Sequence, residues 1–262
     1  MRRITSARLK FTEFISRSLS GTRAYLPLRE IFQAVFNPGC VQHRTARRTF
    51  YSQFVRRGSL VFDVGANVGE YSYTFLQLGA TVVALEPNPE CCRMLSRLGH
   101  RTHLTIRCEA VGDEMGEVSL FVGDHSGHST VSEEWMARAS QSDPGFRWNK
   151  VVKAHINTLD RIRQEHGRPD FIKIDVEGYE ANVLRGMSFR PSALSFEFHT
   201  YSLERIRECL LLQMFESGCS FNIALGDTWE FVWPTWRDKE AVLDYTSKLT
   251  GKVFGDVYAS FI

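Results

Sequence analysis

The chain has 262 residues, of which 43% are hydrophobic and 24% are charged, and its formal net charge is +2. These values are typical of a soluble globular protein, with room for one well-buried α/β domain and an appendage. No stretch approaches the roughly 18 consecutive apolar residues that a membrane-spanning helix requires, so such a helix is not expected.

The first 60 residues are strongly basic. They contain 12 Lys and Arg against two acids, a balance of +10, whereas the rest of the chain carries 20 basic and 28 acidic residues, a balance of −8. Apolar residues at near-helical spacing from Ile4 to Leu19 indicate an amphipathic helix with a basic face. Such a helix can pack on the domain or lie on a membrane or an anionic polymer, and an Arg- and Ser-rich start also occurs in organelle transit peptides. We therefore expect residues 1–57 to form a basic, helical N-terminal extension.

The first informative motif is VFDVGANVGEYS, residues 61–72. A short buried strand, residues 60–64, leads into a turn with Gly65 and Gly69, then a helix over 69–78 and a strand over 81–86 that ends at Glu86. This order places helix N–H groups close to a ligand, and an acid about 20 residues beyond the glycines suits ribose hydroxyls. A nucleoside cofactor is favoured over the alternative, a tight turn with a helix cap.

Asp63 distinguishes between nucleoside cofactors. A carboxylate that leads into the turn would repel a pyrophosphate, and the turn is D-x-G-x-N-x-G, not G-x-G-x-x-G. A cation fits better, and S-adenosylmethionine carries both an ammonium and a sulfonium. Asp63 would accept from the ammonium through water or a neighbouring N–H.

Strands and helices continue to alternate along the chain, which predicts about seven strands in a mostly parallel sheet covered on both faces, within a domain spanning 58–262. The expected elements are helix 88–98, strands 104–110 and 117–123, a strand and short helix over 151–160, strand 171–176, helix 180–187, strand 194–199, helix 203–218 and strands 221–225 and 257–262. Lys153 and Lys173 alternate out of the strand patterns and need no functional explanation. Residues 124–150 break the alternation and are expected to form a substrate lid or a solvated loop.

Cysteine and histidine spacing gives no sign of a metal centre. The six cysteines show neither C-x-x-C spacing nor a regular framework, so we expect buried, reduced thiols in a cytoplasmic protein. The eight histidines lack metal-ligand spacing, and no metal is expected, although the acids described next would permit a divalent ion.

The second informative block is IKIDVEGYEANVLRGM, Ile172 to Met187. Asp175 should sit at the carboxyl end of a central strand, where open α/β sheets bind their ligands. Glu177 and Glu180 flank the start of the next helix, and the helix dipole explains Glu180 well. The dipole does not explain as well why all three acids of this block lie at a sheet edge that already has Asp63 and Glu86.

Together these blocks resemble the FkbM family of S-adenosylmethionine-dependent methyltransferases. The resemblance spans about residues 60–200 and rests on VFDVGANVGEYS, ALEPNPE, INTLD, IKIDVEGYEANVLRG and the strand-end FEFH, while the flanking segments match weakly. It implies a Rossmann-like class I methyltransferase fold and O-methylation of hydroxyls on sugars, glycolipids and polyketide products. We therefore expect a small hydroxylated acceptor, with nucleic acid not expected as a partner.

The positions of the residues suggest individual roles in binding this cofactor. The methionine half of the cofactor would be held by the first turn, the ribose by Glu86, and the adenine by the end of the third strand. Asp175 would lie beside the transferring methyl or order the acceptor. The candidate cofactor residues are Asp63, Gly65, Ala66, Asn67, Gly69, Tyr71, Glu86, Glu109, Ala110 and Asp175.

Methyl transfer to an alcohol is an in-line displacement that benefits from alignment and from a nearby base. We prefer His199 as the base because histidine transfers protons near neutral pH, with Glu197 orienting it or contacting the acceptor. Glu177 is the rival base, and a His199 that merely pairs with a neighbour is the alternative.

Two other functions stay open from the sequence. One is an NAD-dependent oxidoreductase, against which Asp63 and the missing G-x-G-x-x-G count. The other is a non-catalytic nucleoside-binding protein that uses its basic arm on anionic surfaces.

Overall fold

The computed structural model describes residues 38–98, 102–123, 129–142 and 148–261, so the helix expected near Ile4–Leu19 lies outside the described residues. The helices are α3 (Pro38–Tyr51), α4 (Glu70–Gln77), α5 (Pro89–Leu95), α6 (Glu133–Ser142), α7 (Leu159–His166), α8 (Glu180–Arg185), α9 (Leu203–Leu210) and α10 (Lys239–Ser247), with short 3-10 turns at Ser96–Leu98, Thr200–Ser202 and Gln213–Phe215. The strands are β1 (Leu60–Val64), β2 (Thr81–Leu85), β3 (Leu104–Arg107), β4 (Ala110–Val111), β5 (Gly116–Gly123), β6 (Ser129–Thr130), β7 (Trp148–Asn157), β8 (Phe171–Ile174), β9 (Ala193–His199), β10 (Ser220–Leu225) and β11 (Phe254–Ser260).

The main sheet has seven strands in the order β10-β11-β9-β8-β1-β2-β3. Its neighbours pair in parallel from β3 through β9, and β11 runs antiparallel to both β9 and β10. The strand order reverses between β1 and β8, which leaves a crevice above their carboxyl ends. The expected Rossmann-like α/β fold with a mostly parallel seven-stranded sheet is therefore confirmed.

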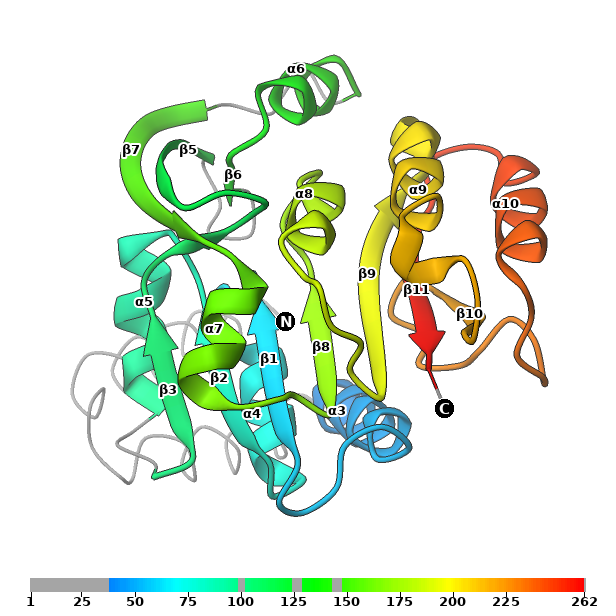
Figure 1. Ribbon diagram of the computed structural model, residues 1–262, viewed down its shortest axis with the longest axis horizontal. Helices are drawn as coiled ribbons and strands as arrows, with labels where there is room; N and C mark the ends of the chain where they lie inside the picture. Colours follow the sequence, from blue (N-terminus) through cyan, green and yellow to red (C-terminus); the bar gives the residue numbers. More distant parts are fainter. Residues whose placement is uncertain (1–37, 99–101, 124–128, 143–147, 262) are drawn as a thin grey trace, which may run out of the picture.

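Helices cover both faces of this sheet (Figure 1). One core packs the sheet against α7, α8, α9 and α10, with Phe62, Ile172 and Leu194 among its fully buried residues. The other packs the opposite face against α3, α4 and α5, where Tyr51 and Phe75 are fully buried. The central strands have almost continuous apolar sequence because both of their faces are covered.

Helix α3 is part of this core. Its Tyr51 hydroxyl lies 3.1 Å from that of Tyr258 on β11, and its ring packs edge-on against Phe171 of β8. The predicted boundary at residue 57 stays a prediction, but the described part of the extension packs tightly on the domain.

A second sheet, in the order β4-β7-β5-β6, was not predicted as a separate layer. In Figure 1 its strands β5, β6 and β7 stand beyond the carboxyl ends of β2 and β3. The expected strand 104–110 is wrong at its end, since β3 stops at Arg107 and Ala110 opens β4. The chain leaves the first sheet at Cys108, which is tied to α5 by a disulfide.

That disulfide, between Cys92 and Cys108, corrects the expectation of reduced thiols throughout. Cys91, Cys209 and Cys219 are not disulfide-bonded and keep their thiols. The two cysteines are 16 residues apart and meet only because α5 returns beside β3. None of the helices among the described residues is long and apolar enough to cross a membrane.

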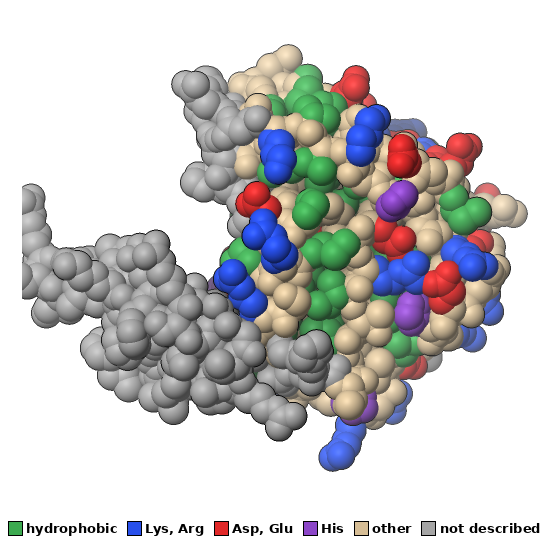
Figure 2. Space-filling model, turned by 90° about the vertical axis from the view of Figure 1, so that its left-hand side faces the viewer, with side chains coloured by type: hydrophobic (Ala, Val, Ile, Leu, Met, Phe, Trp, Pro, Cys, Tyr) green, Lys and Arg blue, Asp and Glu red, His purple; other side chains and the backbone are tan. Residues whose placement is uncertain are grey.

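In the parts that the structure describes, residues 124–150 form regular secondary structure and not a solvated loop, and their role as a substrate lid stays a prediction. They contain β6, helix α6 and the start of β7, whereas 124–128 and 143–147 lie outside the described residues. Trp135 of α6 is only 5% exposed. On the face that Figure 2 shows, acidic and basic side chains are interspersed among hydrophobic ones.

Candidate functional site

The turn between β1 and α4 is built on left-handed backbone. Gly65, Asn67 and Gly69 have φ values of 80°, 48° and 88°. A Cβ placed on Gly65 would lie 1.7 Å from the Asp175 carbonyl oxygen, so only glycine lets the ends of β1 and β8 approach this closely. At Gly69 a Cβ would collide with Leu95 and Leu98, which assigns this glycine to packing against α5.

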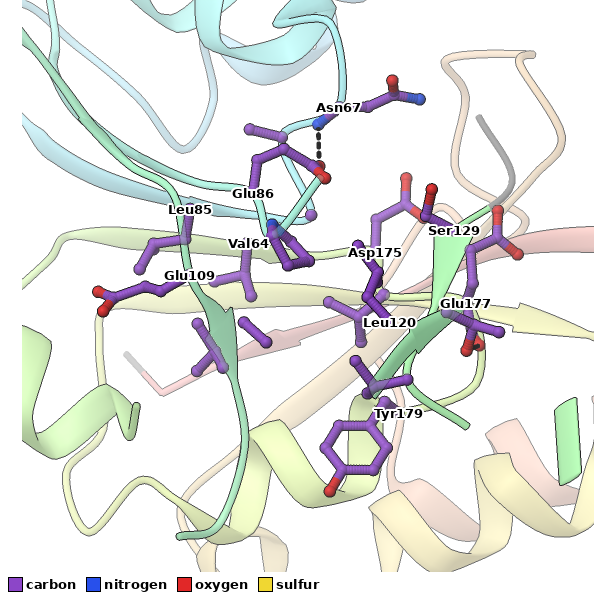
Figure 3. Close-up of a pocket in the computed structure, with 18 of the residues that line it drawn as sticks. Val64, Asn67, Leu85, Glu86, Glu109, Leu120, Ser129, Asp175, Glu177 and Tyr179 are labelled. Atoms are coloured by element: carbon purple, nitrogen blue, oxygen red, sulfur yellow. Dashed lines mark hydrogen bonds between the residues drawn. The ribbon is translucent and has the colours of Figure 1, made fainter. Parts of the chain in front are cut away.

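A cavity opens where the strand order reverses between β1 and β8, above the carboxyl ends of β1, β2 and β8 (Figure 3). It encloses roughly 970 Å³ of empty space when its open mouth is included. Of the sequence-predicted residues, its wall contains Gly65, Ala66, Asn67, Tyr71, Glu86, Glu109, Ala110, Asp175, Glu177 and Glu197. Asp63, Gly69 and His199 do not line it.

Glu86 ends the second strand with its carboxylate held by backbone. Its Oε2 accepts from the Asn67 N–H at 2.7 Å and its Oε1 from the Asn88 N–H at 2.8 Å. Burial raises the pKa of Glu86 to about 7, although the two N–H bonds oppose the rise. Each oxygen keeps a lone pair for a further donor, as binding a ribose diol requires.

Asp63 lies inside β1, only 1% exposed, and not at the cavity wall. Its Oδ2 accepts from the Ser72 hydroxyl at 2.5 Å. Burial raises the pKa of Asp63, while Lys173 and the Ser72 hydrogen bond work in the opposite direction. Asp63 therefore lies beneath the cavity wall. It could interact with a ligand only through an intervening group.

Glu109 reaches the wall from the connection between β3 and β4, and Ala110 reaches it from the start of β4, so neither ends a strand of the main sheet. The Glu109 carboxylate pairs with the Arg107 guanidinium at 2.5 Å, and Arg107 also pairs with Glu165. Both residues line the cavity, on another element than predicted, and their contact with the adenine stays a prediction.

The prediction that Lys173 needs no functional explanation is wrong. It is 1% exposed on the face covered by α3 and α4, and its Nζ donates to Asp175 Oδ2 at 2.7 Å. The ammonium also lies 4.1 Å from the centre of the Tyr71 ring. Burial alone would lower the pKa of Lys173, but the carboxylates around it, Asp175 first, raise it above its usual value. Conversely, burial would raise the pKa of Asp175, but Lys173 holds it below its usual value.

Glu177, Glu197 and His199 converge beside Asp175. One ligating atom from each of the three lies within 4.8 Å of the others. His199 Nε2 is 3.2 Å from Glu197 Oε2, and the Glu197 carboxyl is also hydrogen-bonded to Asp175. The spacing would suit a cation, but because Glu197 is already shared with His199 and Asp175, we interpret the group as handling protons.

Both glutamates of this group resist ionisation. Burial raises the pKa of Glu177 well above its usual value, and the Asp175 carboxylate adds to the effect. Burial and then Asp175 likewise raise the pKa of Glu197. Glu197 therefore keeps its proton and donates it in a hydrogen bond to the Asp175 carboxylate.

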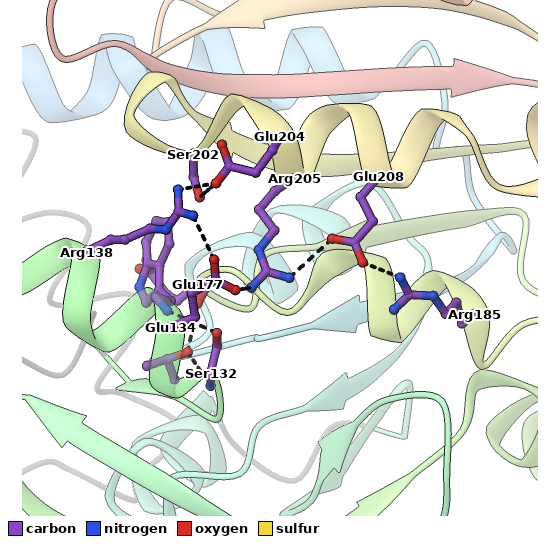
Figure 4. A network of polar contacts seen from close by, with 11 residues as sticks. Ser132, Glu134, Arg138, Glu177, Arg185, Ser202, Glu204, Arg205 and Glu208 are labelled. Carbon is purple, nitrogen blue, oxygen red and sulfur yellow. Dashed lines mark hydrogen bonds and ion pairs between the residues drawn. The ribbon is translucent and has the colours of Figure 1, made fainter.

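Helix α6 closes over this group. The Trp135 ring centre lies 4.9 Å from that of His199 and 5.0 Å from that of Tyr201. Ion pairs bind α6 to α9, where Glu134 pairs with Arg205 and Arg138 pairs with Glu204 (Figure 4). The candidate lid is thus a helix, α6, that ion pairs attach to α9.

Several wall residues were not predicted. They come from the second sheet and the segments beside it: Val111, Leu120, Ser129, Thr130, Val131 and Tyr179. Thr130 Oγ1 donates to the Glu177 carbonyl oxygen at 2.8 Å, so the second sheet also fixes the backbone of Glu177, whose φ is 54°. Tyr179 lies within the second informative block but was not singled out there. No motif marks the other five, because they reach the cavity through the pairing of the strands in the second sheet.

Comparison with known proteins gives a consistent result. The sequence model described as "Methyltransferase FkbM domain" matches residues 63–222. A curated relative, "Hexuronic acid methyltransferase AglP" from Haloferax volcanii, is 25% identical over 139 residues, which cover 52% of this chain and 53% of the relative. The chain therefore spans about half the length of this relative.

Solved methyltransferase structures are similar at low identity. A precorrin-6y C5,15-methyltransferase from Geobacter metallireducens has a TM-score of 0.42 and 10% identity, covering 82% of this chain and 87% of its own. The plantazolicin methyltransferase BpumL in complex with SAH has a TM-score of 0.42 and 9% identity, covering 99% and 98%. A SAM-dependent O-methyltransferase from Thermotoga maritima has a TM-score of 0.40 and 13% identity, covering 82% and 64%. At these TM-scores the likenesses carry no argument about function.

Proposed function

The chain belongs to the FkbM family of methyltransferases and uses S-adenosylmethionine, and from this premise we propose that it methylates a hydroxyl group of a sugar, a glycolipid or another small acceptor. The observation that carries the proposal is the His199–Glu197 pair, 3.2 Å apart, beside the cofactor cavity. An NAD-dependent oxidoreductase and a non-catalytic binder are set aside, because the matching family is one of methyltransferases.

In this proposal S-adenosylmethionine binds in the cavity in one orientation. Glu86 accepts from the ribose hydroxyls, since it is held by two backbone N–H groups at the end of β2. The turn from Gly65 to Asn67 and the ring of Tyr71 face the methionine half, with Asp63 and Gly69 holding the turn from beneath. Glu109 and Ala110 border the adenine. Asp175 faces the charged sulfur, where a carboxylate favours the positive donor over the neutral product.

The acceptor hydroxyl approaches from the side of β9 and α6. It must lose its proton as oxygen attacks the methyl carbon and the bond from carbon to sulfur breaks. His199 takes this proton, and Glu197 orients its ring through the contact to Nε2. Glu177 remains the rival base, because it lies beside His199 and Glu197 and its raised pKa makes its carboxylate a stronger proton acceptor.

A carbohydrate acceptor has a specific argument in its favour. The curated relative is named for methylation of a hexuronic acid, and the matched segment includes 139 residues of this chain. The acceptor side also combines acidic groups with the partly exposed ring of Tyr201, and such surfaces bind sugar hydroxyls and ring faces.

The test is transfer of a labelled methyl group from S-adenosylmethionine to a panel of sugars, uronic acids and glycolipids. The His199→Ala variant should lose at least about a hundredfold in kcat at saturating acceptor, the usual contribution of a positioned base. Glu177→Gln is the matched variant and should retain more activity. If His199→Ala keeps full turnover while Glu177→Gln loses it, the base is Glu177.

Two expectations about surroundings stay predictions. These are the cytoplasmic location and the contact of residues 1–57 with a membrane or an anionic polymer. Residues 1–37 of this extension lie outside the described part of the chain.

A further inference from the structure

A ladder of polar residues crosses the face of the main sheet that α3 and α4 cover. The register places Asp63 of β1 beside Lys173 of β8, and Lys173 beside Ser195 of β9. Two residues further along, Glu197 of β9 lies beside Asp256 of β11. These side chains share one face because alternate residues of a strand point the same way.

Lys173 is the cation at the centre of this ladder, and among the described residues it is the one buried lysine. Its ammonium is fixed from two sides, by Asp175 Oδ2 at 2.7 Å and by the Tyr71 ring at 4.1 Å. A lysine suits this place because its charge is compact, on a stem that stays within the apolar layer.

Acidic groups outnumber this cation around Asp175. The titratable groups that influence or face Asp175 are Asp63 of β1, Glu86 after β2, Lys173 of β8, Glu177 and Glu180 before and in α8, Glu197 and His199 of β9, Asp256 of β11 and Tyr71 of α4. A buried carboxyl among so many others takes up a proton unless a cation pairs with it. Asp256 Oδ1, buried without a hydrogen-bond partner, shows how incompletely the acids are neutralised.

Asp175 nevertheless lines the cofactor cavity, with 28% of its side chain exposed, whereas only 2% of the Lys173 side chain is exposed. The lysine therefore cannot contact a ligand directly and acts through the carboxylate. We propose that Lys173 is a positioning residue of the methyl-transfer site, whose buried ammonium keeps Asp175 ionised and directed toward the positively charged methyl donor. The inference rests on the proposed orientation of the cofactor, with its sulfur beside Asp175.

The proposal predicts how the protein distinguishes the charged donor from the neutral product. S-adenosylmethionine and S-adenosylhomocysteine differ at the sulfur, so an ionised carboxylate beside the sulfur favours the donor. The ratio of the two dissociation constants isolates this effect. Groups that contact the ribose or adenine, such as Glu86, act on both ligands and cancel in the ratio.

The experiment is calorimetric titration of both ligands into wild type, Lys173→Met, Asp175→Asn and the double variant. At pH 7 each single variant should lose roughly tenfold in preference for the donor, and the double variant should lose no more than Asp175→Asn alone. At pH 9 the Lys173→Met protein should regain its preference as Asp175 ionises, whereas Asp175→Asn should not. A purely structural role for Lys173 would give no such rescue.

The matched control is Lys153→Met, which removes an exposed lysine from β7 and should leave the ratio unchanged. If Lys173→Met fails to fold, Lys173→Met/Asp256→Asn removes one buried acid together with the cation and keeps the charge balance; Asp256→Asn is its control. A wild-type ratio in the Lys173 variant at pH 7, or losses that multiply in the double variant, would overturn the proposal.

This test also separates the inference from the proposed function. A protein that binds both sulfur ligands but methylates no hydroxyl refutes O-methylation alone, and the ratio still tests Lys173. A wild type that binds neither ligand overturns both.

Discussion

The affinity for S-adenosylhomocysteine should depend on pH through one carboxyl group. Glu86 has a pKa of about 7 in the unliganded protein, because it is buried, against an ordinary value of 4.5. Its two oxygens already accept one backbone N–H each, from Asn67 and Asn88. Only the ionised form has acceptor capacity for both ribose hydroxyls, so ligand binding should require loss of the proton.

The size of the effect follows from this pKa. Roughly one tenth of Glu86 is ionised at pH 6 and roughly nine tenths at pH 8. The affinity should therefore rise about tenfold between these two values and level off above pH 8. At pH 7 about half a proton should leave the protein for each ligand that binds.

Calorimetry at pH 6, 7 and 8, in pairs of buffers with different heats of protonation, measures both quantities. The Glu86→Gln variant is the control, since it cannot ionise. It should bind about 2 kcal/mol more weakly, the loss expected for hydrogen bonds to a charged group, and its affinity should not vary over this range. An affinity in the wild type that is flat from pH 6 to 8, with no heat difference between buffers, would refute the assignment of Glu86.

Three further predictions test the construction of the site. Gly65→Ala should abolish cofactor binding because its Cβ would meet the Asp175 carbonyl, whereas Gly58→Ala, with a similar φ of 87° and open space around it, should cost only about 1 kcal/mol of stability in urea unfolding. Burial raises the pKa of Glu180 to about 7, so the native state holds a proton that the unfolded state releases, and stability falls as pH rises. Between pH 5.5 and pH 8 the unfolding free energy of the wild type should therefore fall by about 2 kcal/mol more than that of Glu180→Gln. An equal fall in both proteins would show that Glu180 is not the cause. Dialysis against a chelator should leave methyl transfer unchanged; loss of activity that added Mg²⁺ restores would instead assign Glu177, Glu197 and His199 to a metal.

Much of the part of the cavity that we assign to S-adenosylmethionine could be predicted from local sequence. The turn after β1 needs glycine at Gly65 because two strand ends touch there, and this requirement is visible as a motif. Glu86 and Asp175 were located because strand ends in a parallel sheet share one edge. The general order of strands and helices followed from their alternation.

The prediction failed where contacts join distant segments. Lys173 was interpreted as a residue pointing out of a strand, but a sheet covered on both faces has no outer side. Its carboxylate partners are Asp175 just after β8, Asp63 on β1 and Asp256 on β11. The wall contributed by Thr130 and Leu120 depends on the second sheet, and the bond between Cys92 and Cys108 depends on α5 returning beside β3. None of these pairings leaves a local pattern.

The central claim is transfer of a methyl group from S-adenosylmethionine to a hydroxyl at the His199 side of the cavity. The most direct measurement follows an isotope-labelled methyl group into a carbohydrate acceptor and then treats the product with mild base, which cleaves methyl esters and spares methyl ethers. The account predicts a base-stable product formed by the wild type and strongly reduced with His199→Ala. Label that base releases, or a product formed equally well by the variant, would contradict it.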